Sequence, residues 1–331
     1  MGFRHFEPTY KYKMKRKNTS NWIRVFVWLT LMAVLTLLAV GIWFCFSDRT
    51  SIASMKWLQL LQTLALFFFP PLLTAYFCCE QPLHWLHLDR GMRWQTMLFA
   101  ILLMLCAIPG INLLSHLNQQ LTLPSFLEPL EDLIRSQEEA ANRLTEQFLQ
   151  VNTIGGLLVN IGLMALLPAM AEELTFRGIL QSLLNPPAFN DVSVPSKPLS
   201  THIGNTQSLT DNAVSASSKS LSARTHIAIW ATAIIFSFVH FQFYGFIPRM
   251  LMGAMFGYML AWTGSLWVPM LMHFTNNAIA VLSYYIAYNY SLDADSFDSI
   301  GISSTLYLGI LSLILVFAAL LAYPRHRLCS Q

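Results

Sequence analysis

Charged residues are scarce in this sequence. Of its 331 residues, 20 are Lys or Arg and 17 are Asp or Glu, so that 11% of the chain is charged. This is less than half of the roughly 25% that is typical of globular proteins. Hydrophobic residues make up 55%, and the few charges fall almost wholly between long apolar runs, as in membrane proteins with several spans. The composition therefore excludes a soluble protein of this size.

Cysteine is also sparse. The five cysteines all lie in or near apolar runs: Cys45, Cys78, Cys79, Cys106 and Cys329. Because they lack the paired spacing of metal ligands, neither a zinc ribbon nor a disulfide framework is indicated.

The apolar runs predict an all-α bundle of about eight transmembrane helices. The first run, 25–46, is uncharged and at about 1.5 Å per residue is long enough to cross a hydrocarbon core of roughly 30 Å. We interpret it as an uncleaved anchor, because the apolar part of a signal peptide has about 7 to 15 residues and ends at small residues. The further runs are 57–79, 96–114, 151–184, 225–248, 250–264, 265–287 and 302–323.

Two details of these runs predict local packing. The sixth run is short, but Gly253 and Gly257 are spaced for close contact with another helix. Adjacent prolines, Pro70 and Pro71, are expected to bend the second helix.

Lys and Arg are shared unevenly between the two sets of alternating loops, and this predicts the orientation. The tail 1–24 holds seven of them, and its side of the membrane collects 14 in all, against five on the opposite side. Positive residues are retained in the cytoplasm, so both termini are expected there, in a multi-pass protein of the cell membrane. A basic cluster directly before a span is typical of such a topology signal, and no nucleic-acid partner is expected.

Four further segments complete the predicted organisation. The first three helices occupy 25–116. The segment 117–150 has six acidic residues and apolar residues at helical spacing, which predicts an amphipathic extracytoplasmic helix that either covers the bundle or gates access to it. A core, 151–323, holds the remaining helices, and a short cytoplasmic tail, 324–331, follows. Within the core, 185–224 has nine Ser and four Pro, which predicts a disordered cytoplasmic loop.

Few ionisable residues lie inside the apolar runs. Of 17 acidic residues only Glu172 and Glu173 do so, and of nine histidines only His240 and His273 lie well within a run. Such a residue costs about 2.5 to 3.5 kcal/mol in the bilayer core, so each is a candidate functional residue. Glu173 and Arg177 are four apart and can pair on one helix face. Glu172 points roughly 100° away and is free for chemistry.

Two chemistries remain open for these residues. His273 and Asn277 share a helix face and can both donate hydrogen bonds to one small group, as an oxyanion hole requires. Alternatively, Glu172, His240 and His273 can act as three ligands of a divalent metal such as zinc, with an open position for water. The spacing does not separate these alternatives, because the residues come from three different helices.

Three motifs occur in order on successive apolar runs: Glu172-Glu173-x-x-x-Arg177, Phe236-x-x-x-His240 and His273-x-x-x-Asn277. In these motifs and their order the sequence resembles the CAAX protease and bacteriocin-processing family of intramembrane proteases. The stretch 263–269, Thr-Gly-Ser-Leu-Trp-Val-Pro, is also similar to that family's approach to its third motif. The resemblance covers roughly 151–282, and the loop 185–224 is longer than we expect of the family.

The resemblance implies an all-helical bundle with a water-accessible cavity that cleaves peptide bonds. It also implies the roles of the residues: water activation by Glu172 and His240, oxyanion stabilisation by His273 and Asn277, and support of the first motif by Glu173 and Arg177. The family is described both as glutamate-dependent and as metalloproteases, so both mechanisms stay open. The expected partners are the lipid bilayer and a membrane-associated protein or peptide, of which prenylated CAAX proteins and bacteriocin precursors are examples.

Two other functions are consistent with ionisable residues inside a membrane. In a proton-coupled transporter the same Glu and His side chains form a relay, and a non-proteolytic scaffold retains the motifs while binding partner spans. A transporter favours repeated halves with matching broken helices, and the sequence shows no such repeat. The sequence therefore favours an intramembrane endopeptidase.

Overall fold

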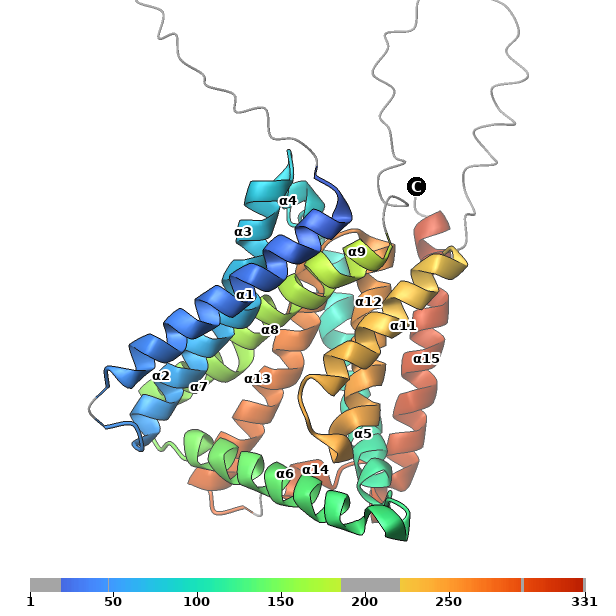
Figure 1. Cartoon of the computed structure of the whole chain (residues 1–331). Helices are drawn as coiled ribbons and strands as arrows, with labels where there is room; N and C mark the ends of the chain where they lie inside the picture. The colour runs from blue at the N-terminus through green and yellow to red at the C-terminus, as the bar shows by residue number, and fades with distance from the viewer. Residues whose placement is uncertain (1–18, 47, 186–220, 293–294, 330–331) are drawn as a thin grey trace, which may run out of the picture.

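The structure is a computed structural model that describes residues 19–46, 48–185, 221–292 and 295–329. Every regular element in these ranges is helical (Figure 1), which confirms the all-α prediction. Most of the basic tail and nearly all of the predicted loop 185–224 lie outside the described residues.

The elements of the first half of the chain are α1 (Asn21–Phe44), α2 (Ile52–Thr63), η1 (Leu64–Phe68), α3 (Phe69–Cys78), α4 (Pro82–Trp85), α5 (Trp94–Gln119), η2 (Ser125–Leu127) and α6 (Glu128–Leu149). Those of the second half are α7 (Ile154–Asn160), η3 (Ile161–Leu166), α8 (Leu167–Glu173), η4 (Leu174–Gln181), α9 (Ser182–Leu184), α11 (Ala223–Phe238), η6 (Phe243–Gly245), α12 (Phe246–Thr263), α13 (Trp267–Asn289), α14 (Asp295–Asp298), η7 (Ser303–Thr305) and α15 (Leu306–Cys329).

Each of the eight apolar runs corresponds to a helical segment, but not all of these segments are long and apolar enough to cross a membrane. Five are: Asn21–Phe44, Ile52–Cys78, Trp94–Gln119, Ile154–Leu184 and Ser303–Tyr323. The helix Ala223–Phe238 is apolar but shorter. These helices support a multi-pass membrane protein, while the count of eight spans and the orientation of the termini stay predictions.

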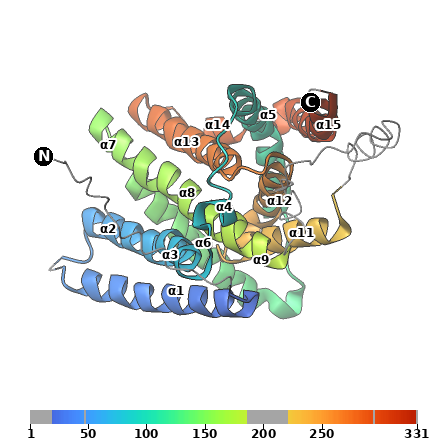
Figure 2. The same ribbon diagram turned by 90° about the horizontal axis from the view of Figure 1, so that it is seen from above.

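The helices form a bundle with a cross-lying helix at one end. The start of α1, the end of α9, the start of α11 and the end of α15 lie at the same end, and α6 lies across the opposite end (Figure 1). Seen along the bundle, α1 and α2 lie on one side and α5 and α15 on the other, with α8 and α13 between them (Figure 2). The two segments that carry the first and third motifs are therefore central.

The C-terminal end of α6 is tied to the bundle by a buried polar contact. Nζ of Lys56 in α2 donates to the carbonyl oxygen of Phe148 at 2.9 Å and to Oδ1 of Asn160 at 2.7 Å. Nδ2 of Asn160 in α7 donates to the same carbonyl at 2.8 Å. These contacts hold α6 against the ends of the other helices. The helix also has one apolar face, which suits it to cover them.

The glycines of α12 lie in close contact with neighbouring helices, as their spacing predicts. A Cβ added at Gly253 would lie 3.1 Å from Phe236 of α11, and one added at Gly257 would lie 2.9 Å from Ile229 of the same helix. Because glycine has no side chain, these two positions let α11 and α12 approach each other closely.

One predicted helix boundary is wrong. The fifth run does not continue as a helix to residue 248, because α11 ends at Phe238 and a turn follows in which Phe241 has a positive φ of 52°. The polar His240 and Gln242 of this turn are flanked by aromatic residues in a run that is apolar overall, so hydropathy alone does not reveal it. The last predicted run, 302–323, agrees with the candidate span Ser303–Tyr323, and the helix itself continues to Cys329.

Candidate active site

The first motif lies where an α-helix widens into a π-helix. Glu172 and Glu173 end α8, and Arg177 lies in the π-helical segment η4. π-Helical turns occur frequently at functional sites, since the extra residue per turn redirects side chains. In this segment nearly every side chain is buried.

Glu173 and Arg177 form a fully buried ion pair, with Nη1 of the arginine 2.7 Å from Oε1 of the carboxylate and neither side chain exposed. Nη2 of Arg177 donates to the carbonyl oxygen of Gly253 in α12 at 2.9 Å. The guanidinium also lies over the ring of Phe236 in α11, 4.5 Å from its centroid. The pair thus connects the first motif with the helices on either side, as a structural role requires.

His273 is oriented by the same carboxylate. Its Nδ1 lies 3.0 Å from Oε1 of Glu173, and since an ionised carboxylate only accepts, Nδ1 carries the proton of this bond. Phe256 of α12 stacks on the imidazole with a centroid separation of 5.5 Å. These two contacts direct Nε2 of His273 away from Glu173 and towards Glu172.

Glu172 lies opposite both histidines. Its Oε2 is 3.8 Å from Nε2 of His240 and 3.8 Å from Nε2 of His273. These distances are too long for direct hydrogen bonds but suit a water molecule that bridges the groups. Oε2 is buried and has no hydrogen-bond partner among the described residues, so a water would also satisfy an unpaired acceptor.

The site is partly accessible. The side chain of His240 is 29% exposed and that of Glu172 is 16% exposed, whereas that of His273 is only 9% exposed. His240 and Glu172 are therefore the more accessible residues of the candidate site, while His273 lies deeper in the bundle.

His240 occupies the turn after α11 and not the helix that the sequence predicts. Its Nδ1 lies 2.7 Å from the carbonyl oxygen of Phe236, which can only accept, so Nδ1 is the protonated nitrogen. In the neutral imidazole, Nε2 is then an acceptor that faces Glu172.

Asn277 is not brought into hydrogen-bonding contact with the other motif residues. It lies one turn beyond His273 on α13, and its Oδ1 accepts a hydrogen bond from Nδ2 of Asn276 at 3.2 Å. Its oxyanion role therefore stays a prediction from the resemblance.

The arrangement does not fit a bound metal ion. No group of three His, Cys, Asp or Glu side chains in the described parts of the chain is placed to hold one. Ligand atoms of a tetrahedral zinc, at about 2.0 to 2.1 Å from the metal, lie roughly 3.3 Å apart, whereas both separations from Glu172 are 3.8 Å. We therefore derive no catalytic step through a metal.

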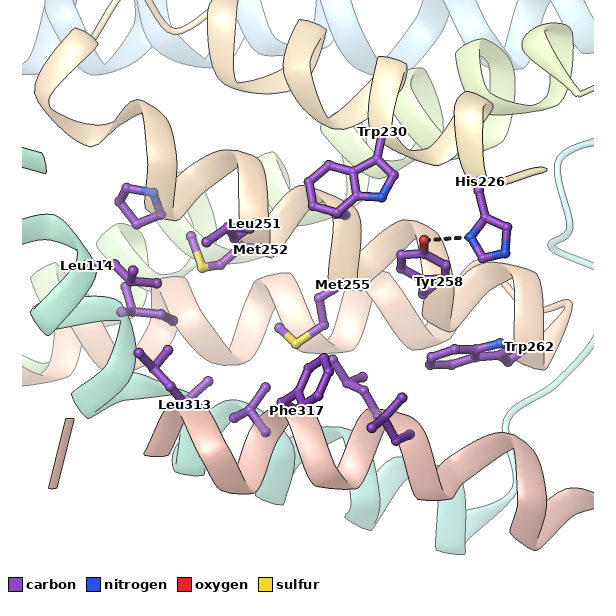
Figure 3. A pocket seen from close by; sticks show the side chains of 17 residues that line it. Leu114, His226, Trp230, Leu251, Met252, Met255, Tyr258, Trp262, Leu313 and Phe317 are labelled. Carbon is purple, nitrogen blue, oxygen red and sulfur yellow. Dashed lines mark hydrogen bonds between the residues drawn. The ribbon is translucent and has the colours of Figure 1, made fainter. Parts of the chain in front are cut away.

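A separate apolar cavity of about 570 Å³ lies between α5, α11, α12 and α15. Figure 3 shows its lining side chains, among which His226 and Tyr258 form a hydrogen bond of 2.7 Å from Nδ1 to the hydroxyl oxygen. Neither Glu172 nor the motif histidines line it. The candidate catalytic residues thus lie outside this cavity.

Sequence reasoning missed Arg249 as a residue of the site. In the sequence it is only one of the five Lys and Arg residues on the side opposite the termini, but the structure places it in the first turn of α12, where Nη2 donates to Oε1 of Gln242, two residues after His240. The spacing of four between Arg249 and Gly253 is the signal that could have placed both on one helix face.

Comparisons with known proteins agree with this site. Residues 154–279 match the family model described as "Type II CAAX prenyl endopeptidase Rce1-like", and this range includes all seven named residues of the three motifs. For these residues the match confirms the resemblance to the CAAX protease and bacteriocin-processing family, which is a protease family.

Other comparisons add less. The uncharacterized protein YpbD of Bacillus subtilis (strain 168) is 37% identical over 60 residues, which cover 17% of this chain and 32% of that protein. The match therefore spans about a third of the relative's length. No solved structure matches this chain significantly.

Proposed function

We propose that this protein is an intramembrane endopeptidase that hydrolyses a peptide bond of a membrane-associated protein or peptide. The observation that carries the proposal is the placement of one carboxylate oxygen of Glu172 at 3.8 Å from Nε2 of both His240 and His273. Three proton acceptors or donors thus face a common point, where a single water can be activated. The family match, which is to a protease family, supports the same reaction.

In the proposed mechanism the water lies between Glu172 and His240. Its oxygen attacks the carbonyl carbon of the scissile bond while one of its protons passes to Glu172, with Nε2 of His240 as the second acceptor that orients it. The carbonyl oxygen becomes an oxyanion. When this intermediate collapses, the carbon–nitrogen bond breaks and the proton held by Glu172 passes to the leaving amine.

The oxyanion needs hydrogen-bond donors, and His273 and Asn277 are the proposed ones. Because Nδ1 of His273 donates to Glu173, its Nε2 carries a proton only when the ring is an imidazolium. In that form Nε2 is a charge-assisted donor to the oxyanion. Asn277 would donate from Nδ2 after it turns from its contact with Asn276.

The family description names CAAX prenyl endopeptidases, so a peptide with a prenylated cysteine near its C-terminus is the first substrate class to test. The prenyl group belongs to this proposal, because the family match is to residues 154–279 alone.

The test compares the purified wild type with Glu172→Gln and His240→Gln, each assayed on membrane-anchored peptides. Loss of a positioned general base lowers the rate by about 100-fold or more, so we expect cleavage to fall that far without a change in thermal stability. The control is Glu139→Gln, because that side chain is 68% exposed on α6. Undiminished cleavage by Glu172→Gln would contradict the mechanism, and metal analysis of the same preparations tests the metal alternative.

A further inference from the structure

Arg249 lies on the face of α12 that lines the candidate active site. It precedes Gly253 by four residues and Phe256 by seven, so all three share one face of the helix. The carbonyl oxygen of Gly253 accepts from Arg177, and Phe256 stacks on His273. One turn towards the start of α12, the same face therefore presents a guanidinium.

The guanidinium is held from the side of the His240 turn. Nη2 of Arg249 donates to Oε1 of Gln242 at 2.6 Å, and Nη1 lies 3.5 Å from the carbonyl oxygen of the same residue. Gln242 follows His240 by two residues. The arginine is thus fixed next to the more accessible of the two catalytic histidines.

Arg249 has no ion-pair partner in the described parts of the chain. The two carboxylates whose charges act on it are Glu172 of the candidate site and Glu138 of α6. Oε1 of Glu138 instead accepts a hydrogen bond from the backbone of Tyr244 at 2.9 Å. The positive charge of Arg249 is therefore not neutralised by direct contact.

A comparison within the molecule shows that this arrangement is unusual. Arg177 is fully buried and has Glu173 at 2.7 Å, as expected for a cation inside a membrane bundle. Arg249 is only partly buried. Its guanidinium has five N–H donors, of which Gln242 accepts two, so part of the guanidinium remains accessible to another acceptor. A planar guanidinium in this state is suited to bind a carboxylate through two parallel hydrogen bonds.

We propose that Arg249 binds a carboxylate of the peptide substrate and thereby selects peptides that carry one beside the scissile bond. The proposal rests on the proposed function of the same site and names a feature of its substrates. The carboxylate is either the C-terminal carboxylate of the substrate or the side chain of an Asp or Glu. Both offer the same pair of oxygens to the guanidinium.

The experiment uses three matched membrane-anchored peptides in detergent: one with a free C-terminal carboxylate, one with a C-terminal amide, and one with the amide and an added Asp after the scissile bond. The wild type is compared with Arg249→Gln, Arg249→Lys and the control Arg143→Gln, which removes an exposed cation of α6. A charge-assisted contact of this kind contributes roughly 10- to 100-fold.

We expect the wild type to cleave at least one carboxylate peptide with a kcat/KM roughly 10- to 100-fold above that of the amide peptide. Arg249→Gln should lose this preference, because its kcat/KM for the carboxylate peptides falls to about its own value for the amide peptide. Arg249→Lys should keep part of the preference, and Arg143→Gln all of it. Which peptide is preferred identifies the source of the carboxylate.

Equal cleavage of all three peptides by the wild type, or an equal loss on all three in Arg249→Gln, would overturn the proposal and give Arg249 a structural role. If the wild type cleaves none, the proposed function fails, and binding decides the inference separately. Fluorescence anisotropy of labelled peptides with Glu172→Gln must then show tighter binding of a carboxylate peptide that the double variant Glu172→Gln/Arg249→Gln loses.

Discussion

Glu173 accepts a hydrogen bond from Nδ1 of His273 at 3.0 Å with the same oxygen that lies 2.7 Å from the guanidinium of Arg177. The two residues come from the first and third motifs, 100 positions apart. The direction of the imidazole therefore depends on a carboxylate that is itself held by a buried arginine. Oε1 of Glu173 therefore both supports the first motif and orients the histidine of the third.

This contact predicts that Glu173→Gln destabilises the protein as well as slowing it. Removing one charge of a buried ion pair costs about 3 to 5 kcal/mol, because the remaining charge is left unpaired. We expect a lower melting temperature in detergent than for Glu139→Gln, whose carboxylate is 68% exposed. Adding Arg177→Met to Glu173→Gln should restore part of the loss. An unchanged melting temperature of Glu173→Gln would show that the pair contributes little.

The close packing of α12 predicts opposite effects for two glycine substitutions. In Gly257→Ala the new Cβ would lie 2.8 Å from Oε1 of Gln181 and 2.9 Å from Ile229. Such overpacking typically costs about 1 to 3 kcal/mol. Gly41→Ala in α1 meets nothing within 4 Å and should be neutral or stabilising, since Ala is the better helix former. Equal melting temperatures of the two variants would contradict the packing argument.

His87, in the loop between α4 and α5, predicts a loss of stability in mild acid. Burial, with a contribution from Arg90, lowers the pKa of His87 to about 4 from 6.5. Between these values the unfolded chain binds a proton that the folded protein does not, so stability falls as pH decreases from about 6.5 to 4, by at most about 3 kcal/mol. Above pH 6.5 the residue has no such effect.

The measurement compares melting temperatures at pH 7.5 and 5.5 for the wild type and His87→Asn. Asparagine tolerates the positive φ of 57° at this position and does not titrate. The decrease between the two pH values should therefore be smaller in His87→Asn. An identical decrease would show that the acid sensitivity arises elsewhere.

The contact between α6 and the His240 turn predicts that α6 affects catalysis from a distance. Oε1 of Glu138 accepts from the backbone nitrogen of Tyr244 at 2.9 Å, and the Tyr244 hydroxyl donates to Glu131 at 3.0 Å. Glu138→Ala removes the hydrogen bond to Tyr244, which follows His240 by four residues. Because such a bond contributes about 1.5 to 3 kcal/mol, we expect kcat/KM to fall roughly 10-fold. Glu139→Ala is the control, and equal rates for the two variants would contradict this coupling.

Much of the candidate site is predictable from the sequence because charge is costly inside a membrane. The positions of Glu172 and Glu173 inside an apolar run identify the first motif, and the spacing to Arg177 predicts the observed ion pair. The same reasoning separates the faces of the two glutamates. The amphipathic helix is also apparent, since its apolar residues recur at helical spacing.

Other features are not readable from hydropathy or spacing. The turn at His240 consists of residues that also suit a helix, and only tertiary contacts such as that of Nδ1 with Phe236 show it. The role of Arg249 depends on which face of α12 meets the site, and a run with hydrophobic residues on all sides does not reveal its orientation. The proximity of Glu138 to the site depends on how α6 crosses the bundle, which is a long-range contact.

The segment Ile154–Leu184 contains two π-helical stretches, η3 and η4. Each wide turn holds about one residue more than an α-helical turn, so each shifts the following side chains by roughly 100° relative to a regular helix. Relative to a regular α-helix, the face on which a residue lies is therefore shifted twice along this segment. Nε2 of Gln181, at the end of η4, donates to the carbonyl oxygen of Gly257 in α12 at 3.2 Å. A one-residue deletion in η4 after Arg177 would rotate Gln181 away from α12, so this contact between the two segments depends on the irregularity.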